Sequence, residues 1–171
     1  MEGEVLMCIV RKADYYYGAL LSVLVNNEFS PVMIEAGNKR KIYGLFTDNG
    51  DEYQIYSKFL SKPSSNGQNS STWSFVFSDN EIEEIKTIKG KKQGKDTIFA
   101  FICSQNKLNN TEIALIKFEE LEKCIDLNRQ YQGQLSVSIR RKKGSHGLWV
   151  YGTNRSLDYA LKVSRDVIKN L

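Results

Sequence analysis

A turn signal between two alternating segments is the feature that most restricts what this chain can fold into. The pair Asn49-Gly50 separates residues 42–47 from residues 53–59, and apolar and polar side chains alternate in both segments. Such alternation is typical of strands with one buried face. Asn-Gly favours tight hairpin turns because both central residues need a positive φ angle. The sequence therefore predicts an antiparallel pair of strands, and with it a β-sheet.

A helix is expected before this hairpin, over residues 15–26. Leu20, Leu21 and Leu24 recur there at helical spacing, and Asp14 can serve as the N-cap. One apolar stripe of this kind suits a helix that packs on a sheet.

Further strands and helices follow the hairpin. Ser78 and Glu81 form a capping-box pattern that predicts a helix through about Ile88. The other expected elements are strands at 32–35, 73–77, 98–103, 112–118, 134–140 and 148–151, and helices at 119–125 and 156–171. Residues 61–71 are rich in Ser, Asn, Gly and Gln and are expected to form a polar surface loop. This order predicts an α+β or α/β fold with a central mixed β-sheet and flanking helices.

Composition indicates one globular domain over residues 1–171. The 171 residues are 41% apolar, which is enough to bury a sizeable core. No apolar run approaches the roughly 20 residues of a membrane span, so we expect no membrane association. The chain has 3 cysteines and no C-x-x-C pair, which favours reduced thiols and a cytoplasmic location.

Positive charge gathers in three runs although the net charge is only +4. The runs are residues 39–41, residues 86–95 and residues 140–143, and Trp149 follows the last one closely. Clustered Lys and Arg contact phosphates, and planar rings stack on bases. If the runs converge in space, they predict a nucleic-acid surface; taken singly, each also fits an ordinary solvated turn. The residues expected to bind nucleic acid are Arg40, Lys91, Lys92, Arg140, Arg141, Lys142, Lys143, His146 and Trp149.

Acidic residues and a lysine around the hairpin are candidates for catalysis. Glu35, Asp48, Asp51 and Lys58 are of the types that metal-dependent phosphodiester cleavage needs. Carboxylates hold a divalent cation, and a lysine orients the attacking water or stabilises developing charge.

These segments resemble the PD-(D/E)xK nuclease superfamily, in which a helix precedes a hairpin whose second strand carries an acid, one residue and a lysine. Residues 40–47 and 53–58 look like that hairpin, and residues 96–103 and 112–121 look like the later strands. The family's motif acids would fall at Tyr56 and near Gly44, where this chain has no carboxylate.

The resemblance implies a restriction-endonuclease-like fold. For an active member it also implies Mg²⁺, held by Glu35 with Asp48 or Asp51, and a water organised by Lys58. A member without activity would keep the scaffold and need no cofactor.

Two functions therefore remain open from the sequence. The first is nucleic-acid binding on a nuclease-like scaffold, with or without Mg²⁺-dependent cleavage, and with DNA favoured over RNA. The alternative is a non-catalytic interaction module, such as an inhibitor or accessory subunit of a defence or restriction system, that binds a nucleic-acid-associated protein through the hairpin at residues 134–151. The oligomeric state is also open, a homodimer included.

Overall fold

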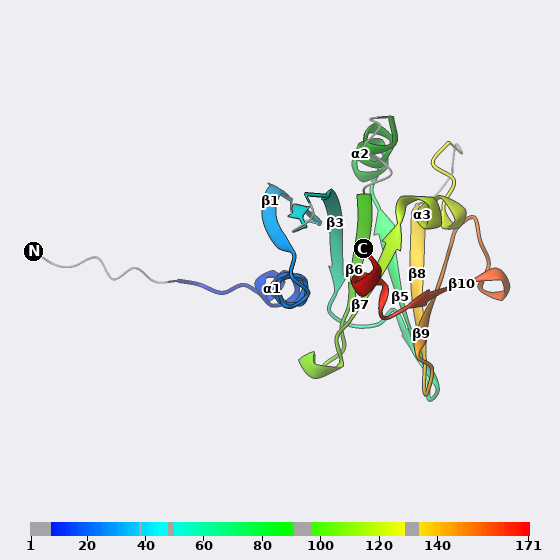
Figure 1. Cartoon of the computed structure of the whole chain (residues 1–171). Helices are drawn as coiled ribbons and strands as arrows, with labels where there is room; N and C mark the ends of the chain where they lie inside the picture. The colour runs from blue at the N-terminus through cyan, green and yellow to red at the C-terminus, as the bar shows by residue number, and fades with distance from the viewer. Residues whose placement is uncertain (1–7, 38, 48–49, 91–96, 129–133) are drawn as a thin grey trace, which may run out of the picture.

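Two five-stranded sheets and three α-helices make up the described part of the chain (Figure 1). The computed structural model describes residues 8–37, 39–47, 50–90, 97–128 and 134–171. The expected α+β class is confirmed. The expectation of one central sheet was incomplete, because the strands divide between a mixed sheet and an antiparallel sheet.

The mixed sheet has the order β1-β2-β3-β6-β7. Its strands are β1 (Ser30–Ala36), β2 (Lys41–Phe46), β3 (Glu52–Leu60), β6 (Thr97–Cys103) and β7 (Glu112–Lys117). Strands β2 and β3 pair antiparallel from Lys41↔Ser57 to Phe46↔Glu52, which confirms the expected hairpin. Strands β3 and β6 are parallel, and a parallel pair requires a long crossover connection.

That crossover contributes two strands to the antiparallel sheet, whose order is β10-β9-β8-β5-β4. Its strands are β4 (Ser65–Asn66), β5 (Ser70–Phe77), β8 (Leu135–Lys142), β9 (Gly147–Gly152) and β10 (Leu161–Ser164). The polar segment 61–71 thus contains β4 and the start of β5, and is not only a loop.

The core lies in two layers, one on each face of the mixed sheet. Helix α1 (Lys12–Asn26) buries Leu20 and Leu24 on one face. The antiparallel sheet covers the other face, where the Phe75 and Phe101 ring centroids are 4.8 Å apart. Helices α2 (Asp79–Gly90) and α3 (Phe118–Cys124) pack against this second layer. Strand β6 of the mixed sheet is therefore buried on both faces.

The expected C-terminal helix over 156–171 was wrong. This segment forms the short 3-10 helix η3 (Leu157–Tyr159), strand β10 and a second 3-10 helix, η4 (Val167–Asn170). Strand β10 pairs with β9 from Leu161↔Val150 to Ser164↔Gly147, and Val163 is buried. Tertiary pairing at the sheet edge thus overrides a weak helical pattern. Across the described ranges, no helix has the length and apolar character needed to cross a membrane.

Candidate nucleic-acid interface

The outer face of the antiparallel sheet carries cationic, hydroxyl and aromatic side chains. In β5 and β8 the inward side chains are apolar ones such as Trp73 and Ile139, so the alternating positions face outward. We define the outer face as Ser70, Thr72, Ser74, Val76, Ser136, Ser138, Arg140, Lys142, Trp149, Tyr151, Lys162 and Ser164. Val76 is 41% exposed, and Lys142 and Lys162 are also exposed, so this face meets solvent.

Three cations surround the half-buried ring of Trp149. Arg140 is its partner in the β8–β9 register, and Lys162 is its partner in β10. The ring centroid lies 4.3 Å from Lys142 Nζ and 5.6 Å from Lys162 Nζ. Each such cation–π contact contributes about 0.5–1 kcal/mol at an exposed site. The ring is therefore at the centre of the positive charge on this face.

This positive charge has no compensating carboxylate on the outer face. Strands β5, β8, β9 and β10, all within the described ranges, contain no Asp or Glu. Gly147 has a specific role here, because a Cβ atom at this position would lie 2.8 Å from Lys162 Cε. The absence of a side chain at Gly147 therefore leaves room for the Lys162 side chain.

A basic pocket of about 410 Å³ adjoins the outer face. Its cationic lining residues are Arg141, Lys142, Lys143 and Arg165, and residues 66–71 form much of the rest. The Lys143 amide donates to the Asn69 carbonyl at 2.8 Å, which joins the basic turn to the polar segment. Ser70 and Lys142 belong to both pocket and outer face, so the two surfaces are continuous.

Glu112 neutralises part of this charge. Its carboxylate accepts hydrogen bonds from Arg165 Nε and Arg141 Nη1, each at 2.9 Å. Burial opposes ionisation of Glu112, but the two guanidinium groups outweigh that effect and hold its pKa below the usual range. Among the described residues, no carboxylate pairs with Lys142 or Lys143. These two lysines are therefore the described pocket cations that lack a carboxylate partner.

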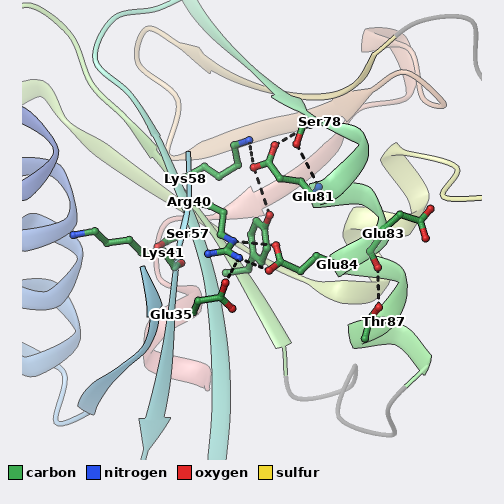
Figure 2. Close-up of polar contacts among 11 residues, drawn as sticks. Glu35, Arg40, Lys41, Ser57, Lys58, Ser78, Glu81, Glu83, Glu84 and Thr87 are labelled. Carbon is green, nitrogen blue, oxygen red and sulfur yellow. Dashed lines mark hydrogen bonds and ion pairs between the residues drawn. The ribbon is translucent and has the colours of Figure 1, made fainter. Parts of the chain in front are cut away.

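Arg40, from the first basic run, lies away from this surface, beside α2. Arg40 Nη2 is 2.7 Å from Glu35 Oε1 (Figure 2). Arg40 Nε donates to Glu84 Oε2 at 2.9 Å, and Arg40 Nη2 also donates to Glu84 Oε1. The bonds to Glu84 and Glu35 raise the pKa of Arg40, although burial opposes them. Arg40 is compensated by two carboxylates, which leaves it poorly suited to hold a phosphate.

Lys58 and Glu81 form a buried pair beside the Arg40 cluster (Figure 2). Lys58 Nζ donates to Glu81 Oε1 at 2.6 Å and to the Val76 carbonyl at 2.7 Å. Burial lowers the pKa of Lys58, while the contact with Glu81 opposes that shift. Burial alone would raise the pKa of Glu81, but bonds from Lys58 and from the Ser78 amide hold it below its usual range. Lys58 thus joins β3 to β5 and to the start of α2.

The expected catalytic acids are not brought together by the hairpin. Glu35 is in register with Ile42, whereas Asp51 adjoins the Phe46↔Glu52 pair at the other end of β2. Four residue steps along β2, from Ile42 to Phe46, separate these positions by about 13 Å. Asp51 donates its amide to Thr47 Oγ1 at 3.0 Å, and Asp48 lies outside the described residues.

A single Mg²⁺ ion needs its ligands at about 2.0–2.1 Å. Glu35 and Asp51 do not fit one ion, and the described ranges contain no cluster of three or more His, Cys, Asp or Glu residues able to hold a metal.

The basic runs are not all brought to one place. The pocket that Arg40 lines shares no residue with the pocket that Arg141, Lys142 and Lys143 line. In Figure 1, α2 lies at the top and the connection between β8 and β9 at the bottom. His146 is exposed in that connection, near the basic pocket, whereas Lys91 and Lys92 lie outside the described residues.

Sequence reasoning missed several residues of this surface. Lys162 and Arg165 fall in the segment that the sequence pattern predicts to be a C-terminal helix. The alternation Leu161, Lys162, Val163, Ser164 was the available signal for a strand.

Comparison with known proteins assigns no function to these residues. No protein-family model, curated protein or solved structure matches this chain.

Proposed function

We propose that this chain binds nucleic acid through the outer face of the antiparallel sheet and the adjoining basic pocket. The observation that carries the proposal is the group of cations around Trp149 on a face without carboxylates. Lysine and arginine side chains that replace the counterions of phosphates supply most of non-specific nucleic-acid affinity. The proposed ligand is DNA in preference to RNA.

The arrangement of the mixed sheet supports a nuclease-like scaffold for this function. Helix α1 is followed by the β2–β3 hairpin, then by the parallel strand β6, and β7 leads into α3. This is the layout that the resemblance to PD-(D/E)xK nucleases implies. At the motif positions, however, Tyr56 is buried and Gly44 lies against Ile34. We therefore propose a restriction-endonuclease-like scaffold that binds nucleic acid without relying on hydrolysis.

Salt dependence tests the proposal directly. The affinity for a labelled DNA duplex, measured by fluorescence anisotropy, should fall steeply between about 50 and 200 mM salt. A Lys142→Ala/Lys162→Ala variant should lose about 1.8 from the slope of log K against log salt, because each phosphate contact contributes about 0.9. Lys86→Ala is the matched control, since Lys86 pairs with Glu83 on α2. Absent binding of duplex and single-stranded DNA alike, or binding with the same slope in the double variant, would overturn the proposal.

A protein-binding role is the second candidate, and strand β1 favours it. This strand is at the edge of the mixed sheet, and Val32, Met33 and Ile34 are 53%, 46% and 58% exposed. An exposed apolar edge strand can pair with a strand of another chain, a second copy included. Light scattering should then show an assembly that Ile34→Lys dissociates. A monomer at every concentration would remove self-association from consideration.

A further inference from the structure

We infer that the nucleic acid on the outer face is single-stranded, and that an unpaired base stacks on Trp149. This inference rests on the proposed function and specifies its ligand. In a duplex, the faces of each base are already covered by its neighbours in the stack. A protein ring therefore gains a base contact mainly from an unpaired strand, where any base can offer its face.

Two aromatic rings follow each other along the outer face. Trp149 and Tyr151 are alternate residues of β9, so their positions are about 6.8 Å apart on the same side of the sheet. Both side chains are only partly exposed, which limits their rotamers before a ligand arrives. Rings held at such a spacing can accept two bases of one extended strand.

The lysines beside Trp149 are compatible with stacking. The ammonium groups of Lys142 and Lys162 contact the ring from the ends of flexible exposed side chains. A base–aromatic stack is stronger than an exposed cation–π contact, so a base can displace an ammonium group from the ring. The displaced lysine is then free to contact a phosphate of the same strand.

Arg140 supplies a cation that stays in place. Its Nη2 donates to Ser70 Oγ at 3.1 Å, and the residue is opposite Trp149 in the register. The outer face thus offers a ring for the base, mobile lysines for phosphates and a fixed guanidinium beside them. This combination is typical of single-strand binding surfaces, which join a basic path to stacking rings.

Tryptophan fluorescence provides the test, because the chain has 2 tryptophans and Trp73 is 0% exposed. Emission from Trp149 should be quenched when a thymidine 12-mer binds at about 50 mM salt. We expect the full chain to bind this oligonucleotide at least tenfold more tightly than a 12-base-pair duplex. Trp149→Ala should weaken single-strand binding by about 5- to 100-fold and change duplex binding less than twofold.

Two further variants guard against a folding defect. Trp149→Phe keeps a ring and should keep most of the single-strand affinity. Tyr159→Ala removes a ring that is 74% exposed outside the outer face, and should change nothing.

The measurements distinguish failure of this inference from failure of the proposed function. Duplex binding that equals or exceeds single-strand binding, without quenching, overturns this inference and leaves the proposed function standing. Single-strand binding that is unchanged in a folded Trp149→Ala variant also overturns it. If neither nucleic acid binds, both the inference and the proposed function fail.

Discussion

The ammonium group of Lys58 lies 2.6 Å from the carboxylate of Glu81, and both side chains are 8% exposed. Glu81 also accepts a hydrogen bond from the Ser78 amide at 2.8 Å. The same carboxylate therefore caps the N-terminus of α2 and pairs with Lys58 of β3 in the mixed sheet. A lysine that the sequence assigns to catalysis therefore joins α2 to the two sheets. The consequence for experiments is that its removal reports on stability as well as on activity.

Lys58→Ala should lower the free energy of unfolding by about 3–5 kcal/mol, because it leaves the Glu81 carboxylate buried without its cation. Urea denaturation at pH 7 measures the effect. Lys86→Ala is the control, since the Lys86–Glu83 pair is exposed and its loss should cost less than about 1 kcal/mol. Equal midpoints for both variants would show that the Lys58–Glu81 pair does not stabilise the fold.

Stability should fall in acid in a way that depends on Glu81. The pKa of Glu81 is lower in the folded state than the unfolded value of about 4.3. The unfolded chain therefore takes up this proton first, and the stabilisation is present above about pH 4.3 and lost as the pH falls through the folded pKa. Glu81→Gln keeps the capping-box acceptor but does not titrate.

The difference in unfolding free energy between wild type and Glu81→Gln should thus narrow from pH 7 to pH 3. Urea midpoints across this range measure it, with the exposed Glu83→Gln as control. A difference in unfolding free energy that stays constant with pH would contradict a lowered pKa of Glu81 in the folded state.

Two glycines should respond to alanine in opposite directions. A Cβ at Gly152 would lie 2.6 Å from the backbone oxygens of Cys124 and Ser136, so Gly152→Ala should destabilise by about 1–3 kcal/mol. Gly18 lies exposed inside α1 with no atom within 4 Å of the added Cβ. Gly18→Ala should stabilise by about 0.5–1 kcal/mol through helix propensity. Thermal unfolding compares the two variants. Stability changes of the same sign in both variants would contradict the close packing around Gly152.

Neutralising Glu112 should strengthen nucleic-acid binding. Glu112→Gln removes the carboxylate that compensates Arg141 and Arg165 beside the basic pocket. The slope of log K against log salt should steepen by about 0.9–1.8, for one or two additional phosphate contacts. Anisotropy titrations measure it, with the exposed Glu119→Gln as control and circular dichroism to verify folding. An unchanged slope would place the phosphates away from this pocket.

Local patterns were sufficient for several elements. The Asn49-Gly50 turn predicts the β2–β3 hairpin, because the required φ angles and the alternation are properties of neighbouring residues. Gly50 has a φ of 84°, as such a turn needs. The Ser78 and Glu81 capping box likewise predicts the start of α2, and Glu81 does accept the Ser78 amide.

The site depended on long-range pairing. Tyr151 and Lys162 reach one face only because β10 pairs with β9 and β9 with β8, and sequence spacing does not specify these partners. The same holds for Lys58, whose partner Glu81 is 23 residues away and on another element.

By itself, then, the sequence determined the hairpin, the start of α2 and the apolar faces, since backbone preference and periodicity act over a few residues. The first helix begins earlier than the sequence indicated, with Arg11 and not Asp14 as its N-cap. Tertiary structure alone decided that the strands divide into two sheets, that the C-terminal segment completes one edge, and that the cations gather around Trp149. Those outcomes depend on which distant segments bury each other's apolar faces, and that choice is made by the whole chain.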